Sequence, residues 1–296
     1  MKIAVSGATG LIGSALVDHL RGDGHTVVRL VRRESDLRDG DILWSVDDQV
    51  LDPADLVGTD AVVHLAGAPI GQRWTDEAKA EIMSSRRDGT RLLATAMAGL
   101  DGGPEVFVSG SAVGFYGSRG DEVLTEESAP GEDFLADVVT TWESAADPAR
   151  DAGLRVVHPR TGVVLAEGGP LVDKVELPFK LGIGGKVGNG QQWVPWISMV
   201  DEVRALAHLV TSELAGPVNL CGPDPARNVR MTKALGAAWN RPTLVPVPVF
   251  AIRVLYGEMG VELATASQRA IPEVLAASGF TFTHATIEEA ADAALG

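Results

Sequence analysis

Several residue types are scarce in this chain of 296 residues. It has one cysteine, Cys221, which excludes an internal disulfide and is far short of the thiolate set of a metal centre. We read Cys221 as a small buried residue in a protein of a reducing compartment. No apolar run approaches the roughly 20 residues that a membrane-spanning helix needs, and the first residues contain no apolar signal-peptide segment. The sequence therefore predicts a cytoplasmic protein with no metal site and no membrane contact.

Basic residues are also a minority. The chain has 25 lysines and arginines against 40 aspartates and glutamates, a formal net charge of -15. Such an excess of negative charge repels phosphate backbones, so we expect no nucleic-acid partner. We interpret the charge as a contribution to solubility.

The first two thirds of the chain alternate short β-branched segments with longer helical patterns. This alternation is typical of a parallel sheet covered by helices on both faces, the doubly wound α/β class. The expected strands are 2–6, 26–31, 61–65, 105–109 and 155–157. The expected helices are 11–21, 75–98 and 134–152. We therefore predict a dinucleotide-binding domain over 1–165, with its sheet completed by about 194–222.

The remaining segments, 166–193 and 223–296, are predicted to form a smaller lobe on the substrate side. Five glycines among residues 182–190, together with the Gly-Gly-Pro sequence at 168–170, indicate loops. The other expected elements are a strand at 218–221 and helices at 203–213, 229–240, 250–256 and 287–295.

The sequence from Ser6 to Gly13 reads SGATGLIG and spaces three glycines as G-x-x-G-x-x-G. This spacing is informative because it follows an expected strand and opens an expected amphipathic helix. Gly7 would permit the tight turn, Gly10 would let the backbone approach a pyrophosphate, and Gly13 would let the helix pack on the strand. The alternative is an ordinary turn from strand to helix. The context favours a dinucleotide held at the helix N-terminus.

The end of the second strand indicates which dinucleotide binds. An NAD site usually has an acidic residue there for the ribose 2′-hydroxyl. This chain has Arg32 and Arg33 instead. Arginine binds phosphate through charge-assisted hydrogen bonds worth roughly 1.5 to 3 kcal/mol each, which favours the 2′-phosphate of NADP(H) about 10- to 100-fold. The alternative is that both are solvated surface side chains.

At this point the chain resembles the extended short-chain dehydrogenase/reductase family, which includes nucleotide-sugar epimerases. The resemblance covers nearly the whole chain and is closest to an atypical subgroup called epimerase-family or SulA-like. The matching sequences are SGATGLIG, VVHLAG, VSGSAVGFYG and GNGQQWVPWISMVDEV, and for the subgroup Arg73-Trp74, Ser85-Arg86, Asp133 to Ala136, Trp142-Glu143 and Pro159 to Gly162.

The resemblance implies roles for individual positions and a small-molecule substrate. The residues it places at the pyrophosphate are Gly7, Thr9, Gly10, Leu11 and Ile12. Those it places beside the adenosine ribose and the nicotinamide are Leu65, Ala66, Gly67, Pro159 and Arg160. It makes Ser111 the catalytic serine, and it implies a homodimer formed through the two long helices.

One part of the family pattern is missing. Family members carry a tyrosine and, four residues later, a lysine that lowers the tyrosine pKa for proton transfer. This chain has only two tyrosines, Tyr116 and Tyr256, and neither is followed by lysine at that spacing. The family alignment places Leu135 and Val139 at the dyad positions, and Arg86 where many relatives have asparagine. Because general acid catalysis contributes about 10²- to 10⁴-fold, the usual chemistry at the usual rate is not expected.

Other side chains are candidates for proton transfer or substrate binding. Tyr116 follows the fifth strand and would bring a phenol to the site, or else it packs beside the loop as a structural residue. We read His64 as a core histidine, and His158 lies near the expected nicotinamide end. Tryptophans in loops would either line a flat substrate or pack in the core: Trp74, Trp193 and Trp196.

The sequence thus favours an NADP(H)-dependent oxidoreductase or epimerase-like enzyme that uses Ser111, and with it Tyr116, in place of the usual dyad. The alternative is a non-catalytic protein that binds NADP(H) as a sensor or regulator.

Overall fold

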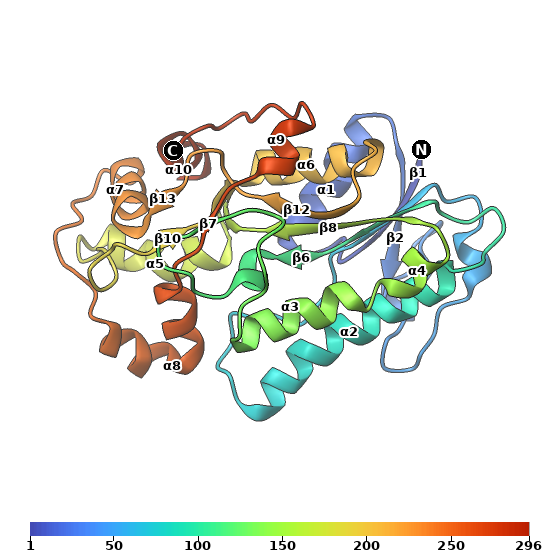
Figure 1. The fold of residues 1–296 in the computed structure, drawn as a ribbon, viewed down its shortest axis with the longest axis horizontal. Helices are drawn as coiled ribbons and strands as arrows, with labels where there is room; N and C mark the ends of the chain where they lie inside the picture. The colour runs from blue at the N-terminus through green and yellow to red at the C-terminus, as the bar shows by residue number, and fades with distance from the viewer. Residues whose placement is uncertain (296) are drawn as a thin grey trace.

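The computed structural model describes residues 1–295, and its centre is a parallel sheet (Figure 1). The strand order is β12-β8-β5-β4-β1-β2-β3, and the short β6 pairs with β8. The strands are β1 (Lys2–Ser6), β2 (Thr26–Val31), β3 (Ile42–Leu43), β4 (Ala61–His64), β5 (Val106–Ser109), β6 (Ser111–Ala112), β8 (Arg155–Thr161) and β12 (Gly216–Leu220). Because β1 pairs with β2 on one side and with β4 on the other, the chain winds outward in both directions. The predicted doubly wound fold is confirmed.

Helices cover both faces of this sheet (Figure 1). One face carries α1 (Leu11–Gly22) and α6 (Met199–Thr211), and the other carries α2 (Asp76–Met97), α3 (Phe134–Ser144) and α4 (Asp147–Asp151). Two fully buried apolar cores hold the layers together. Leu16, Leu206 and Val5 belong to the first core, and Leu93 and Phe107 belong to the second.

Local signals placed several boundaries correctly. The limits of β1 and β2 agree with the predicted ranges, and the side chain of Thr75 caps α2 by accepting a hydrogen bond from Ala78 N at 3.2 Å. The single helix predicted over 134–152 is wrong, because α3 ends at Ser144 and α4 begins at Asp147. Pro148 lacks the amide hydrogen that a continuous helix would donate to the carbonyl of Ser144.

The glycine-rich region 168–190 contains a helix that the sequence did not reveal. Residues 170–180 form α5 (Pro170–Lys180), with Gly169 as N-cap and Pro170 in the first turn. The prediction of loop throughout this region is therefore wrong for α5. Val172 and Phe179 are buried and anchor the helix, whereas the flanking glycines dominate the local sequence pattern.

The smaller lobe lies at the left of Figure 1. It contains α5, α7 (Asn228–Ala238), α8 (Val249–Thr265), α10 (Ile287–Leu295) and the antiparallel pair β10 (Trp193–Val194) and β13 (Ala226–Arg227). The remaining short elements are β7 (Val123–Leu124), β9 (Val163–Leu165), β11 (Trp196–Ser198), β14 (Arg269–Ala270), α9 (Glu273–Ala277) and 3₁₀ turns at Glu34–Asp36, Pro53–Leu56 and Val113–Tyr116. The division into two units stays a prediction, since Leu275 of α9 lies in the core of the main sheet.

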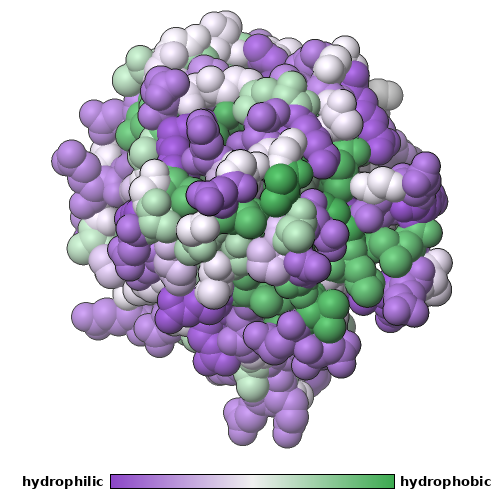
Figure 2. Space-filling view, turned by 90° about the vertical axis from the view of Figure 1, so that its right-hand side faces the viewer, coloured by the Kyte–Doolittle hydropathy of each residue, from purple (hydrophilic) through white to green (hydrophobic). Residues whose placement is uncertain are grey.

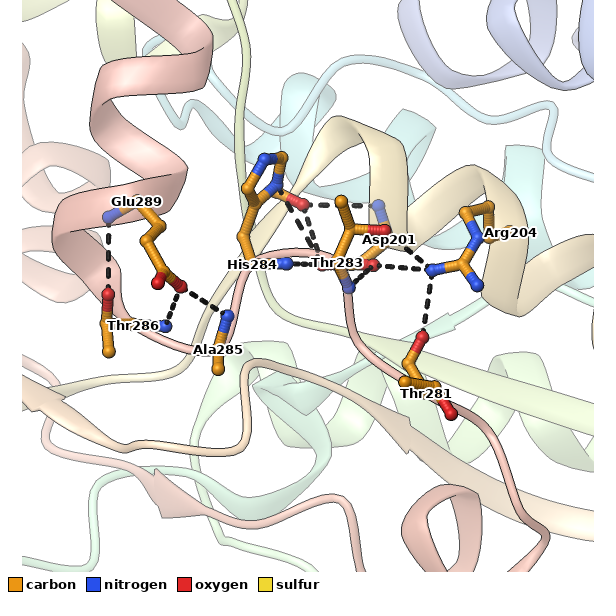
Figure 3. Close-up of polar contacts among 9 residues, drawn as sticks. Asp201, Arg204, Thr281, Thr283, His284, Ala285, Thr286 and Glu289 are labelled. Carbon is orange, nitrogen blue, oxygen red and sulfur yellow. Dashed lines mark hydrogen bonds and ion pairs between the residues drawn. The ribbon is translucent and has the colours of Figure 1, made fainter.

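A buried carboxylate fastens the C-terminal segment to the main domain (Figure 3). Asp201, near the start of α6, is 1 % exposed and accepts hydrogen bonds from Thr283 N at 2.7 Å and His284 N at 2.9 Å. The next turn is closed by a capping box, in which Glu289 accepts from Thr286 N and Thr286 Oγ1 accepts from Glu289 N. This arrangement ties the segment just before α10 to the start of α6.

The surface is mainly polar. Figure 2 shows the side of the molecule that lies at the right of Figure 1, where hydrophilic side chains predominate and apolar ones form separate patches. Large exposed apolar side chains occur in the lobe, at Leu244, Phe250 and Val254. Among residues 1–295, none of the helices combines the length and the apolar character needed to span a membrane.

Candidate dinucleotide and active site

The glycine motif has the geometry that its spacing predicted. Gly7 adopts a positive φ of 70°, and a Cβ there would lie 2.9 Å from Ala66 N. A Cβ on Gly13 would lie 2.1 Å from Gly7 O, so only glycine lets α1 approach β1 this closely. Gly10 is exposed at the N-cap of α1. The turn, the open approach and the close packing are therefore all present.

The N-terminus of α1 is a bare set of amide donors. Within residues 1–295 no side chain caps it, and its first turn contains no acidic residue. Thr9, Gly10 and Leu11 are exposed, and Ile12 is half-buried. Unpaired first-turn amides and the helix dipole together favour an anion at this position, as a pyrophosphate would be.

Arg32 and Arg33 lie next to this turn. The register pairs Ser6 with Leu30, so the residues after β1 and those after β2 emerge side by side at the carboxyl edge of the sheet. Both arginines are exposed, and among residues 1–295 neither forms an ion pair. Two guanidinium groups are thus free to contact a ligand at this edge.

The segment after β4 flanks the glycine turn on its other side. Ser6 also pairs with His64, and Leu65 N donates to Ser6 O at 3.3 Å. Leu65 and Ala66 contact Gly7, and all three are half-buried. The structure therefore brings Leu65 and Ala66 next to the glycine turn, as the family resemblance implied for these positions.

A buried polar network begins at Ser111. Its Oγ donates to Glu143 Oε1 at 2.6 Å, and Arg160 binds the same carboxylate through Nε at 2.8 Å and Nη2 at 2.9 Å. Burial raises the pKa of Glu143, but the hydrogen bonds and charge of Arg160 outweigh this, and the pKa is lowered from its ordinary value. Glu143 is therefore an ionised acceptor that fixes both Ser111 and Arg160.

Tyr116 belongs to the same network. It is fully buried, its hydroxyl donates to Asn219 Oδ1 at 2.7 Å, and Arg160 Nη1 donates to that hydroxyl at 3.1 Å. Burial, only partly opposed by Arg160, raises the pKa of Tyr116 to about 12. A phenol that is enclosed and harder to ionise fits the structural alternative better than a proton donor to substrate.

The expectation that Pro159 and Arg160 line the nicotinamide end gains no support from this geometry. Both are buried, and Arg160 turns toward Glu143, with its guanidinium carbon 3.4 Å from the ring centre of Phe115. Thr161 is the first residue after Arg160 that is only half-buried. The alternation of side chains along β8 directs Arg160 into the layer of α3 instead.

Leu135 and Val139 fill space on α3. Val139 is 3 % exposed and packs in a cluster with Phe115 and Tyr116, whereas Leu135 packs beside Trp74. A Cβ on Gly114 would lie 3.4 Å from Leu135 Cβ, so the helix and the loop are in close contact. The face of α3 at which the family resemblance placed the tyrosine and lysine is apolar at Leu135 and Val139.

The remaining candidates are mostly structural. His64 is fully buried with its Nδ1 2.6 Å from Ser6 Oγ, and burial lowers its pKa to about 3, so the interpretation as a core histidine fits. Burial also lowers the pKa of His158 to about 4, and its Nε2 lies 3.0 Å from Arg150 Nη2. Trp74 and Trp196 are buried, and Trp193 is half-buried between Arg227 and Arg269.

Comparison with known proteins agrees with this arrangement. Residues 3–221 match the model of the NAD dependent epimerase/dehydratase family. The chain belongs to this family. Residues 247–294 match a domain of unknown function, DUF1731, which includes α8 and most of α10. An epimerase family protein of Mycobacterium tuberculosis is 42 % identical over 290 residues, covering 97 % of this chain and 95 % of the relative.

Two solved structures are similar over the whole chain. The human epimerase family protein SDR39U1 (isoform 2), determined with NADPH, is 31 % identical with a TM-score of 0.91, and the match covers 100 % of this chain and 99 % of that one. A nucleoside-diphosphate sugar epimerase of Corynebacterium glutamicum is 37 % identical with a TM-score of 0.83, and this chain spans 58 % of its length. The resemblance to the extended short-chain dehydrogenase/reductase family and its epimerase subgroup is confirmed.

Sequence reasoning missed several members of the buried network. Glu143 was named only as part of the Trp142-Glu143 match, and its contact with Ser111 is a product of the fold. Asn219 and Glu126 gave no local signal. Glu126 Oε1 accepts from Asn219 N at 2.9 Å, a contact between residues far apart in the sequence.

Proposed function

We propose that the chain binds NADP(H) and acts as an oxidoreductase or epimerase-like enzyme without the usual tyrosine and lysine. The observation that carries the proposal is the bare N-terminus of α1 with Arg32 and Arg33 exposed beside it and free of ion pairs within residues 1–295. The solved human relative contains NADPH, which supports the same nucleotide for this chain. NADP(H), when bound, would supply or accept the hydride.

The chain's own residues would perform the rest of the work. The amides of the turn from Thr9 to Ile12 would hold the pyrophosphate, and the two arginines would hold the 2′-phosphate. The hydroxyl of Ser111 donates a hydrogen bond to Glu143, so the lone pairs of the serine oxygen are directed away from that carboxylate. Ser111 would then accept a hydrogen bond from a substrate hydroxyl and orient it. As a neutral hydroxyl it would position the substrate without replacing a general acid.

Nucleotide selectivity tests the first half of the proposal. Arg32→Asp, and separately Arg33→Asp, should weaken NADPH binding about 10- to 100-fold and NADH binding far less, because NADH lacks the 2′-phosphate. Affinities would be measured by fluorescence titration. Arg21→Asp, an exposed change on α1, is the control for a general effect of charge. An equal loss for both nucleotides would contradict the role of the arginines.

The alternative function, a sensor that binds NADP(H) without turnover, is favoured by one observation. Leu135 and Val139 pack against other apolar side chains, so α3 offers no proton donor at those positions. A panel of aldehydes and ketones with NADPH separates the two functions, with Gly10→Val as the nucleotide-binding control. Substrate-dependent NADPH consumption above that control supports the enzyme, and its absence across the panel supports the sensor.

A further inference from the structure

Arg86 is a buried cation for which residues 1–295 provide no anionic partner. It lies on α2 with 7 % of its surface exposed, and its Nη1 donates to Ala68 O at 3.0 Å and to Ile82 O at 3.2 Å. Its Nε is buried and has no hydrogen-bond partner among the residues that the structure describes. Within residues 1–295 no carboxylate oxygen lies within 4.0 Å of the guanidinium group. The two carbonyl oxygens therefore satisfy only part of the hydrogen-bonding capacity of the Arg86 guanidinium.

The charge of Arg86 is correspondingly costly. Burial lowers its pKa to about 10, and no acidic group of the described chain opposes that shift. The ring of Trp142, 5.0 Å from the guanidinium carbon, stabilises the cation in part. A buried charge that lacks a counterion is destabilising unless another group completes the site. Such a residue beside a ligand site is a candidate for ligand binding.

Its position is next to the nucleotide site. A Cβ on Gly67 would lie 3.2 Å from Arg86 Cζ, so the guanidinium packs directly on Gly67. Gly67 follows Ala66, which contacts the turn at Gly7. Within residues 1–295, Nη2 of Arg86 takes part in no hydrogen bond. Unlike Nε, this atom is not fully buried. One arm of the guanidinium is thus left open at the carboxyl end of β4, where ligands bind in this class of fold.

More cations lie along the same loop, residues 67–75. Lys174 Nζ donates to Gly71 O at 3.0 Å. The side chain of Arg73 lies against Gly257, where a Cβ would be 3.9 Å from it. Over the range 1–295, neither Lys174 nor Arg73 has a carboxylate within 4.0 Å. In a chain with a net charge of -15, this loop is thus flanked by three cations that have no ion pair within residues 1–295.

We propose that Arg86 binds an oxyanion of the substrate, a carboxylate or phosphate group, beside Gly67. Arg73 on the loop, and Lys174 of α5 beside it, would attract the same ligand and raise its local concentration. The planar guanidinium fork matches both oxyanions. The assignment of the oxyanion to a substrate rests on the proposed function, whereas the anion site itself exists independently of turnover.

Equilibrium binding tests the proposal. Oxalate and inorganic phosphate would be titrated separately onto the NADPH complex, with sodium chloride at equal ionic strength as reference, and followed by thermal shift and NADPH fluorescence. We expect saturable binding of at least one anion to the wild type. Arg86→Gln should bind that anion at least about 10-fold more weakly than the wild type does. Arg86→Lys, which keeps the charge but not the fork, should be intermediate.

The matched control is Arg87→Gln. Arg87 is the next residue of α2, its side chain is 52 % exposed and it pairs with Asp88. This variant should bind both anions as the wild type does. Equal anion affinity in Arg86→Gln and wild type, or no saturable binding to the wild type, overturns the proposal. An equal weakening of NADPH and anion binding in Arg86→Gln also overturns it, because the cofactor's own phosphates would then be the partner.

Two further measurements keep the test independent of folding and of the nucleotide. If Arg86→Gln does not fold, a wild-type crystal soaked in tungstate should show the anion within hydrogen-bond reach of the Arg86 guanidinium, and its absence there contradicts the proposal. If the wild type binds no NADPH, the proposed function fails. The same anion titrations on the nucleotide-free protein would still report on Arg86.

Discussion

Arg160 and Glu143 form a buried bidentate ion pair, with Nε and Nη2 of the arginine 2.8 and 2.9 Å from the two carboxylate oxygens. The pair joins β8 to α3, and Ser111 donates to the same carboxylate. The expected catalytic serine is therefore held by a charge pair within the protein, and its orientation depends on that pair.

Removing one partner of this pair should be severely destabilising. Glu143→Gln leaves Arg160 buried without a counterion, and we expect a loss of about 3 to 5 kcal/mol in the free energy of unfolding. Urea denaturation would measure it. The control is Glu122→Gln, which breaks an exposed pair with Arg119 and should cost less than about 1 kcal/mol. Equal losses in the free energy of unfolding for the two variants would show that the buried pair contributes no more to stability than the exposed one.

Tyr116→Phe separates a structural from a catalytic tyrosine. The variant leaves Asn219 Oδ1 and Arg160 Nη1 without their shared hydroxyl, so we expect a loss of about 1 to 3 kcal/mol in stability with NADPH affinity intact. Tyr256→Phe is the control, because that hydroxyl takes part in no hydrogen bond within residues 1–295 and the tyrosine is half-buried. Abolished turnover of Tyr116→Phe at unchanged stability would instead identify Tyr116 as the proton donor.

Gly13→Ala should disrupt the contact between α1 and β1. The new Cβ would lie 2.1 Å from Gly7 O, a backbone atom that cannot move without shifting the turn. We expect a loss of about 2 kcal/mol or more in stability, together with weaker NADPH binding. Gly22→Ala, at the end of the same helix with nothing within 4 Å of its Cβ position, should be neutral or slightly stabilising. Similar melting temperatures for the two variants would refute the role given to Gly13.

Glu202 should make stability fall as pH rises. Burial raises its pKa to about 8, against an ordinary value of 4.5. Between these values the folded protein keeps a proton that the unfolded chain has lost, so the free energy of unfolding decreases from about pH 4.5 to pH 8, by on the order of 4 kcal/mol from this group.

Glu202→Gln removes this titration. Glutamine stays neutral, so the variant should lose less stability than the wild type when urea unfolding is compared at about pH 5 and pH 8. The exposed Glu167→Gln is the control and should follow the wild type. Parallel pH curves for wild type and Glu202→Gln would mean that Glu202 is not held neutral.

Much of the fold was predictable because its signals are local. The β-branched runs fixed β1 and β2 to the residue, Thr75 marked the start of α2, and SGATGLIG specified a turn that only glycine accommodates. The helix α5 escaped prediction because glycines on both sides outweighed its two buried anchors, Val172 and Phe179. Its stability comes from contacts with the lobe rather than from its own sequence.

The sequence by itself determined the nucleotide-binding turn, the arginines after β2 and the absence of the tyrosine and lysine pair, because each depends on residues close together in the chain. Only the tertiary structure decided what surrounds them. Ser111 meets a carboxylate 32 residues away, and Tyr116 meets an amide 103 residues away. Arg86 has no anionic partner within residues 1–295. Burial makes these contacts energetically important. A charge or hydroxyl that is removed from water can be stabilised only by the few groups that packing places beside it.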